Sequence, residues 1–332
     1  MLATTARRSE PGRGQVAELQ RARLLTAMVQ EVSERGAGNV SVGHVVGRSG
    51  VSRRTFYEIF DDREDCFLAA FDEALHNAAA VVGPAYGTGG AWHTRLRAGL
   101  TALLGFLDTD RAAARLLIVE SLAAGPSALG RRRQVIADLV AVIELGRTEG
   151  RAKLDPPALT AEAIVGGLLS VLHGRLAGGF DSETSTTNGR GRAEESSLLE
   201  LAGPLMGMIV LPYLGPVAAR KEIERPTPKA NGTGPVVRAD PLQDLPMRLT
   251  YRTMRVLASV AENPGSSNRT IGQSAGIADQ GQASKLLARL HKLGLIENRG
   301  GDPARGEPNA WVLTMTGQQV HDSIAGLADN AS

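Results

Sequence analysis

The chain has 332 residues, of which 42% are hydrophobic and 22% charged, and its formal net charge is +2. This length predicts two or three domains, and the composition is that of a globular protein able to bury a core. The near-neutral total does not indicate a nucleic-acid partner, yet residues 1–60 carry nine arginines against five glutamates. Such a local excess of positive charge can steer a DNA duplex toward one face.

Several kinds of site are excluded or disfavoured. Cys66 is the single cysteine, which excludes an intrachain disulfide and a cysteine-based metal cage. The histidines are scattered, and the sequence has neither a Gly-rich phosphate loop nor a Ser/His/Asp arrangement, so we predict no enzyme and no cofactor. The start of the chain is polar, and the apolar stretch 198–214 is interrupted by Glu, Gly and Pro, so we expect no membrane span and a cytoplasmic location.

Hydrophobic spacing and Pro/Gly content divide the chain into five segments. Apolar residues recur every three or four positions through most of it, which predicts a mainly α-helical fold. The segments are 1–14, a polar arm expected to be disordered; 15–64, a head of short helices; 65–222, an all-helical domain; 223–246, a Pro-rich linker; and 247–332, a compact terminal domain.

Residues 41–60 read SVGHVVGRSGVSRRTFYEIF and predict two short helices joined by a tight turn. Ser41 is placed to cap the first helix and Ser52 the second, while Gly50 provides the positive φ that the turn needs. Phe56 on the second helix, with Ile59 and Phe60, is expected to be buried. The polar side chains left on its open face are Arg53, Arg54, Thr55, Tyr57 and Glu58.

This pattern resembles the TetR family of bacterial regulators. The matching residues are Gly50-Val51-Ser52, Thr55-Phe56-Tyr57, Phe60 and Asp62-Arg63-Glu64, with departures at Val46 and Ser49, where that family prefers Ala. The resemblance implies that the second helix enters the major groove of a double-stranded DNA operator. The implied DNA contacts are Ser41, Ser52, Arg53, Arg54, Thr55, Tyr57 and Arg63, the last at the position of a phosphate-binding lysine. The alternative is that the arginines form only a solvated face.

For residues 65–222 the resemblance implies a ligand-binding and dimerisation domain. Its Ala/Leu/Val-rich helices predict an aliphatic pocket for a small hydrophobic effector. The candidate ligand residues are Phe71, His76, Phe106, Glu120 and His173, although each can equally be a surface or core residue.

Two apolar seams in this domain predict a homodimer joined by an intersubunit four-helix bundle. The seams are Ile164, Gly167, Leu168 and Val171 on one helix, and Leu198, Leu201, Leu205 and Ile209 on a later one. Packing within one chain is the alternative use of the same faces.

The terminal domain is expected to contain three helices, two strands and a last helix. The expected ranges are 248–262, 267–275 and 280–293 for the helices, 295–298 and 310–314 for the strands, and a final helix capped by Thr316. Ser267 and Asp279 are placed to cap the second and third helices. This is the order of a winged helix-turn-helix, and residues 290–296 and 313–317 are similar to the MarR family.

The MarR resemblance implies a second DNA-reading face. Gln280, Gln282, Ser284 and Lys285 would face the major groove, and Arg305 on the wing would enter the minor groove. We therefore predict a ligand-responsive transcription regulator, a repressor, with two DNA-reading modules in each chain. The alternative is a small-molecule sensor whose terminal domain binds a protein partner instead of DNA.

Overall fold

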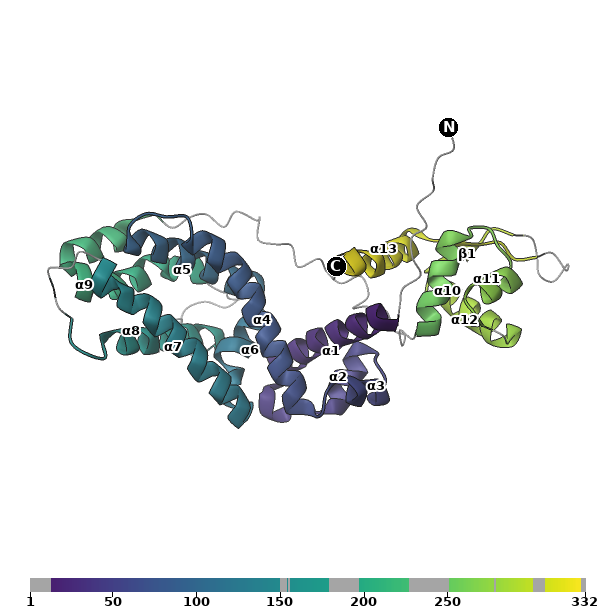
Figure 1. Cartoon of the computed structure of the whole chain (residues 1–332), viewed down its shortest axis with the longest axis horizontal. Helices are drawn as coiled ribbons and strands as arrows, with labels where there is room; N and C mark the ends of the chain where they lie inside the picture. Colours follow the sequence, from purple (N-terminus) through teal and green to yellow (C-terminus); the bar gives the residue numbers. More distant parts are fainter. Residues whose placement is uncertain are drawn as a thin grey trace, which may run out of the picture. The chain divides into compact units, whose positions relative to one another are not determined.

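The computed structural model describes residues 13–149, 154, 156–178, 197–226, 251–277, 279–300 and 308–329, which are mainly helical (Figure 1). These residues form two compact units. The first unit comprises Met1–Ala27, Val42–Asp61 and Val236–Ser332, and the second comprises Met28–Ser41 and Asp62–Pro235. The predicted 1–14 arm and 223–246 linker lie almost wholly outside the described residues.

The N-terminal helices follow the predicted turns closely. They are α1 (Arg13–Arg35), the 3-10 turn η1 (Ala37–Asn39), α2 (Val42–Ser49) and α3 (Arg53–Ile59). Glycines mark two of the breaks, since Gly36 has a φ of 79° and Gly50 a φ of 67°. Both values lie in the left-handed region that glycine adopts without strain.

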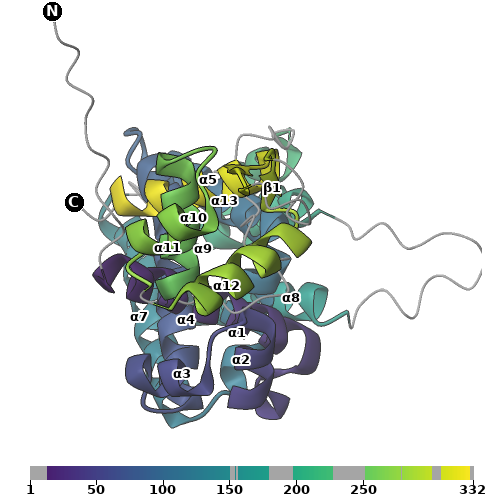
Figure 2. The same ribbon diagram turned by 90° about the vertical axis from the view of Figure 1, so that its right-hand side faces the viewer.

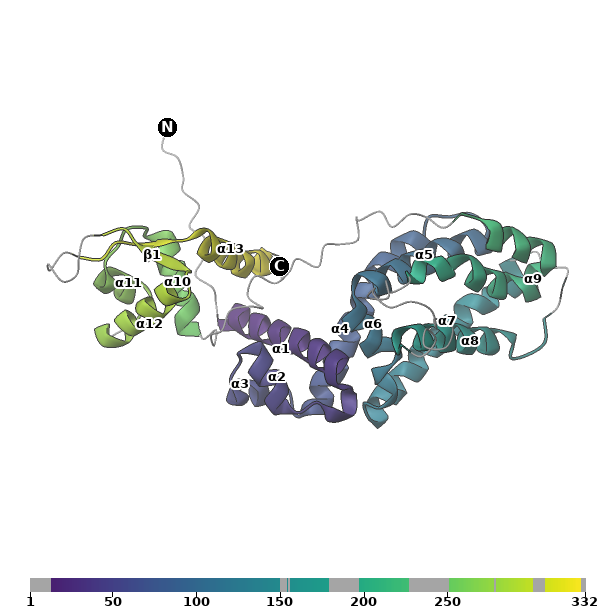
Figure 3. The ribbon, with the colours of Figure 1, turned by 180° about the vertical axis from the view of Figure 1, so that it is seen from behind.

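The all-helical domain begins at α4 (Arg63–Tyr86), whose N-terminus is capped by the Asp62 carboxylate through the Asp65 amide at 2.9 Å. The elements that follow are α5 (Trp92–Thr109), α6 (Arg111–Ile118), η2 (Glu120–Leu122), α7 (Pro126–Glu149), α8 (Thr160–Leu176), η3 (Leu198–Leu201) and α9 (Ala202–Glu224). Helix α5 packs against α4 and α9 (Figure 3). Helix α6 ends at Ile118, and the chain turns at Val119 into η2.

The core of this domain is built around two aromatic side chains. Trp92 and Tyr213 meet edge to face with ring centroids 5.2 Å apart, and the Trp92 Nε1 donates a hydrogen bond to the Val142 carbonyl at 3.2 Å. Leucine, isoleucine and valine side chains of α5, α7, α8 and α9 fill the space around them. Burial of this apolar area is the main stabilising contribution to the domain.

Helix α9 turns back on itself. Its helical run breaks at Gly215, whose φ is 80° and ψ 177°, and the last part of the helix returns so that Ile223 packs on Gly207. The return is fixed by a buried ion pair, because Arg97 Nη1 lies 2.7 Å from Glu222 Oε2. Arg97 also donates to the carbonyl of Arg225 at 3.2 Å, so α5 anchors the chain where the domain ends.

The segment Leu198–Glu224 is long and apolar enough to cross a membrane by length and composition, as are core helices of soluble proteins. Half of its apolar window is buried within this chain. The prolines expected to interrupt it do not prevent a helix: Pro204 lies in the first turn, where no backbone donor is required, and the break comes at Gly215.

The terminal domain has the predicted order of elements. They are α10 (Tyr251–Glu262), α11 (Asn268–Ser274), α12 (Gln280–Lys292), β1 (Ile296–Asn298), β2 (Trp311–Leu313) and α13 (Met315–Asp329). The three helices α10 to α12 group together beside β1 (Figure 2), and β1 pairs antiparallel with β2 so that Ile296 faces Leu313.

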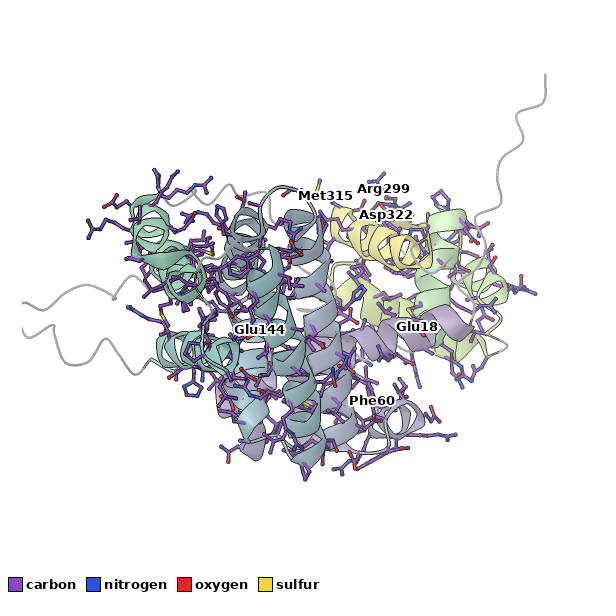
Figure 4. The ribbon with its side chains drawn as sticks, turned by 60° about the vertical axis from the view of Figure 1, so that its left-hand side comes forward. Glu18, Phe60, Glu144, Arg299, Met315 and Asp322 are labelled. Atoms are coloured by element: carbon purple, nitrogen blue, oxygen red, sulfur yellow. The ribbon has the colours of Figure 1, made fainter. Side chains whose placement is uncertain are left out.

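The caps of the terminal domain confirm two predictions and correct one. Ser267 accepts from the Thr270 amide at 3.3 Å, and Asp279 Oδ1 from the Gly281 amide at 2.8 Å. The last helix begins earlier than expected, with Met315 in its first turn (Figure 4). It is Thr314, not Thr316, whose hydroxyl accepts from the Gly317 amide at 3.0 Å.

Candidate nucleic-acid interface

The turn between α2 and α3 is fixed by local hydrogen bonds. The Val51 amide donates to Ser49 Oγ at 3.2 Å, and Val51 itself is buried. Ser52 is the N-cap of α3, since its Oγ accepts from the Thr55 amide at 3.0 Å. These contacts confirm the predicted turn and set the direction in which α3 starts.

Helix α3 has one buried and one open side. Phe56 is completely buried, with its ring 5.7 Å from that of Phe60, just beyond the helix (Figure 4). On the other side Arg53 and Arg54 are exposed, and Tyr57 is 52% exposed. A short helix that presents two guanidinium groups and a phenol to solvent has the chemistry needed to contact phosphates and base edges.

Other predicted DNA contacts on this segment already have hydrogen-bond or ion-pair partners within the chain. Thr55 is half-buried, and its hydroxyl lies 2.8 Å from Ser52 Oγ, so both side chains take part in the cap. Arg54 Nε lies 2.9 Å from Glu58 Oε1, one turn along the same helix. Ser41 is exposed directly before α2. The structure thus gathers Arg53, Arg54 and Tyr57 on one open face and places Thr55 below it.

Arg63 and Glu120 hold the loop between α1 and α2. Arg63 Nη1 donates to the carbonyl oxygens of Ala37 at 2.6 Å and Val40 at 3.3 Å. Glu120 Oε2 accepts from the Ala37 amide at 2.8 Å, and the residue is only 9% exposed. Glu120 therefore binds the backbone of this loop, and Arg63 has a structural contact that sequence reasoning missed.

The other candidate ligand residues lie on α4, α5 and α8. Phe71 is buried and stacks on Phe67 with centroids 6.4 Å apart, His76 is exposed, and Phe106 and His173 are half-buried on α5 and α8.

A surface hollow of about 510 Å³ lies instead where α7 ends and α8 begins. It is lined by Glu144, seen on α7 in Figure 4, and by Arg147, Glu162 and residues 156–159. None of the predicted ligand residues lines it, and its charged rim differs from the aliphatic wall that the composition predicted.

The predicted dimer seams are partly internal. Leu198, Leu205 and Ile209 are 1–3% exposed within a single chain, so they belong to its core and are unavailable to a partner. The spacing of these residues is the same for a core face and an interface, which is why sequence alone left both possibilities open.

In the terminal domain, α12 presents Gln280 and Lys285 to solvent. Gln282 is also exposed, and its Oε1 accepts from Arg252 Nη1 at 3.1 Å. Ser284 is half-buried and accepts from Asn268 Nδ2 at 3.1 Å, so it faces α11 and not the open side as predicted. Arg305 lies outside the described residues.

Positive charge predominates over the three helices of this domain. Residues 251–293 contain six Lys or Arg side chains against two acids. The basic residues are Arg252, Arg255, Arg269, Lys285, Arg289 and Lys292.

The tight glycine turn and the open cationic face of α3 are those of a helix-turn-helix DNA-binding protein. Residues 24–70 match the family model described as bacterial regulatory proteins, tetR family. The N-terminal part of the chain is therefore similar to that family over the residues that contain α2 and α3. Comparison with functionally characterised proteins finds no sequence match.

Solved structures that are similar over part of this chain include several bacterial regulators. The fatty acid degradation regulator FadR from Bacillus halodurans is 17% identical, covers 57% of this chain and 97% of its own, and has a TM-score of 0.47. A tetR-family regulator from Rhodococcus RHA1 is 19% identical, covering 59% and 97% of the two chains with a TM-score of 0.45. FadR from Bacillus subtilis, solved with stearoyl-CoA, is 14% identical, covering 57% and 97% with a TM-score of 0.45. Identities and TM-scores this low do not assign a ligand to this chain.

Proposed function

We propose that this chain is a cytoplasmic transcription repressor that binds a double-stranded DNA operator as a homodimer. The observation that carries the proposal is the exposed set Arg53, Arg54 and Tyr57 on α3, within the segment that matches the tetR-family model. Arginine forks pair with guanine edges or phosphates, and a tyrosine hydroxyl donates to phosphate oxygens. Dimerisation would place two copies of α3 about one DNA turn apart.

The test begins with the duplex that the wild-type chain enriches from a random DNA pool. We expect Arg53→Gln to weaken binding to this duplex about tenfold or more and, if a phosphate contact is lost, to reduce the salt dependence by about one counterion. Arg133→Gln is the matched control, because Arg133 is an exposed arginine on α7. Equal affinity of Arg53→Gln and wild type would contradict the assignment of α3 as the reading helix.

For the terminal domain we propose a winged helix-turn-helix that also contacts DNA. Its support is the capped α11–α12 pair followed by a two-stranded hairpin, together with the excess of basic residues over residues 251–293. Lys285 and Arg289 lie exposed on α12 and are the side chains we expect to approach phosphates. The alternative is a module that binds a protein partner.

Footprinting of the full chain, of Lys285→Gln/Arg289→Gln and of a truncation after Pro226 distinguishes these functions. The truncation keeps Glu222 and Arg225, the two residues that Arg97 binds. A DNA-reading domain gives a shorter footprint and a weaker salt dependence when it is removed. An unchanged footprint and affinity would assign the domain to protein contacts.

A homodimer is supported by an exposed apolar strip on α9. Met208 is 41% and Leu211 47% exposed, Pro204 is exposed one turn earlier, and Gly166 offers a small exposed position on α8. Large apolar side chains that remain exposed along one helix face commonly mark an interface. We propose that this strip, and not the buried Leu205 seam, joins the two subunits.

We further propose that a small hydrophobic effector acts on the helical domain. Its support is the resemblance to ligand-responsive regulators and the aliphatic composition of α5 to α7. Adding candidate apolar compounds to the complex with the enriched duplex, and following the electrophoretic shift, tests this proposal.

A further inference from the structure

Both backbone polar groups of Ala37 are held by charged side chains from other elements. The amide donates to Glu120 Oε2 at 2.8 Å, and the carbonyl accepts from Arg63 Nη1 at 2.6 Å. Ala37 is buried and lies at the start of η1, directly before the chain enters α2. Hydrogen bonds to ionised groups are about twice as strong as neutral ones, so the backbone on both sides of the Ala37 Cα is held firmly.

Glu120 is itself held from the other side. Its Oε1 lies 3.5 Å from Arg115 Nη2, and its side chain is only 11% exposed. Arg115 Nη1 also donates to the Leu176 carbonyl, the last residue of α8, at 2.6 Å. One guanidinium therefore joins the end of α8 to the carboxylate that binds the α1–α2 loop.

The fit around the carboxylate is close. Gly36 precedes Ala37 with a φ of 79°, and a Cβ at Gly36 would lie 3.4 Å from Glu120 Oε2. Both oxygens of Glu120 are thus engaged, Oε2 by the loop and Oε1 by Arg115. The carboxylate is thus held between the loop and Arg115, with one donor on each oxygen.

We propose that Glu120, oriented by Arg115, is a positioning residue that couples the end of α8 to the loop that leads into the helix-turn-helix. This inference rests on the proposed function, because the loop that Glu120 holds leads into the segment that we propose binds DNA. A displacement of Leu176 pulls Arg115 away from Glu120, and the loop then loses the fixed acceptor for its Ala37 amide. Arg63 holds the other backbone polar group of the same residue, the Ala37 carbonyl, and keeps the loop attached to α4.

The experiment compares Glu120→Gln with Glu149→Gln in the full chain. Each substitution replaces a carboxylate that pairs with an arginine. The partner of Glu149 is Arg95 on α5, whose Nη2 lies 2.5 Å from Glu149 Oε2, and this pair does not contact the loop. In glutamine one of the two carboxylate oxygens becomes an NH2 group, which donates and cannot accept, so either the Ala37 amide or Arg115 loses the oxygen that it now meets. Arg115→Gln is the second variant, because its side chain is 33% exposed and its replacement leaves Glu120 in place.

Two measurements are made at a temperature at which every variant is folded. Hydrogen exchange of a peptide spanning 36–40 reports the loop, and affinity for the duplex enriched by wild type reports DNA binding. We expect Glu120→Gln and Arg115→Gln to accelerate exchange in this peptide and to weaken DNA binding about fivefold. Glu149→Gln is expected to match wild type in both.

Unchanged exchange, or faster exchange with unchanged DNA affinity, would overturn the coupling and leave Glu120 a local structural contact. An equal loss in Glu149→Gln would overturn it as well, because the effect would then be general. If Glu120→Gln does not fold, the same outcomes apply to Arg115→Gln. A wild-type chain that enriches no duplex would overturn the proposed function, whereas the exchange of the 36–40 peptide would still decide whether Glu120 holds the loop.

Discussion

Arg53 and Arg54 are neighbours on the open face of α3, but Arg54 must break an ion pair within the helix before it can bind DNA. Arg54 is 90% exposed but paired with Glu58 at 2.9 Å, one helical turn away. Exposed pairs of this spacing contribute about 0.3–0.5 kcal/mol. The carboxylate also adds a negative charge to a face that we propose meets phosphates, so Glu58 opposes binding in two ways.

Replacing Glu58 by Gln should therefore strengthen binding to the enriched duplex. We expect an increase of about two- to threefold at low salt, from release of the pair and removal of the repulsion. Fluorescence anisotropy over a range of salt concentrations measures it, with Glu73→Gln, an exposed acid on α4, as the control. A weaker complex would show that Glu58 itself accepts from a base.

Tyr213 gives the helical domain a dependence on alkaline pH. Burial, and next the charge of Glu144, raise the pKa of this phenol to about 12. The unfolded chain releases the proton near pH 10, so the contribution to stability is present below that pH and is lost as the pH rises to about 12.

Tyr213→Phe should remove this dependence and keep the ring packed against Trp92. In urea unfolding between pH 9 and 12, the difference in unfolding free energy between wild type and variant is expected to fall with increasing pH. A difference that stays constant across this range would contradict the raised pKa.

At the scale of the element, close packing of α7 depends on one glycine. A Cβ at Gly146 would lie 2.7 Å from the Trp92 ring and 2.9 Å from that of Tyr213. Neither ring can move freely, because both are fully buried in the same core. Gly130 lies on the same helix with nothing near its missing Cβ.

These two glycines predict opposite effects of the same substitution. Gly146→Ala should lower the unfolding free energy by about 1–3 kcal/mol through overpacking. Gly130→Ala should raise it by about 0.5–1 kcal/mol, since alanine is the better helix former. Chemical denaturation of both variants measures the effects, and two changes of equal sign would contradict the packing described for Gly146.

Sequence reasoning succeeded where the determinant is local. The caps at Ser52, Ser267 and Asp279 and the turn at Gly50 each depend on a few consecutive residues, so their side-chain patterns predict them. The open face of α3 follows from helical periodicity over one short segment. The predicted start of the last helix was two residues too late, because two threonines lie close together and Thr314, not Thr316, is the cap.

The contacts that sequence reasoning missed are long-range. Glu120 binds an amide 83 positions earlier in the chain, and Arg63 a carbonyl 26 positions earlier. Spacing along one helix cannot show which loop packs against it. A buried acid within an apolar run was the only signal, and that signal is the same for a ligand contact and a backbone contact. For the same reason the sequence could not show whether Leu205 on α9 lies in the core or at an interface, because both kinds of helix face have the same periodicity.

At the scale of the whole molecule, the proposed dimer depends on residues that a single chain leaves exposed. Leu211 is 47% exposed on the first part of α9, and Val217 is 84% exposed after the break at Gly215. A charge at an interface core is strongly unfavourable, whereas the same charge on a solvated surface has little effect.

Leu211→Glu should therefore produce a monomer with much weaker DNA binding, and Val217→Glu should remain dimeric. Size-exclusion chromatography with light scattering, at several protein concentrations, distinguishes them. A dimeric Leu211→Glu would place the interface elsewhere, and a monomeric wild type would contradict the homodimer altogether.

The anchor formed by Arg97 has a mechanical consequence. This side chain binds the Glu222 carboxylate and carbonyl and the Arg225 carbonyl, at the point where the described chain leaves the helical domain. A force that pulls on the backbone beyond Pro226 therefore acts on all the hydrogen bonds of Arg97 at once. These bonds must break together before the end of α9 can separate from α5. If the terminal domain holds DNA while the N-terminal domain holds a neighbouring site, the strain between them would be borne by α5, inside the domain that we propose senses the effector.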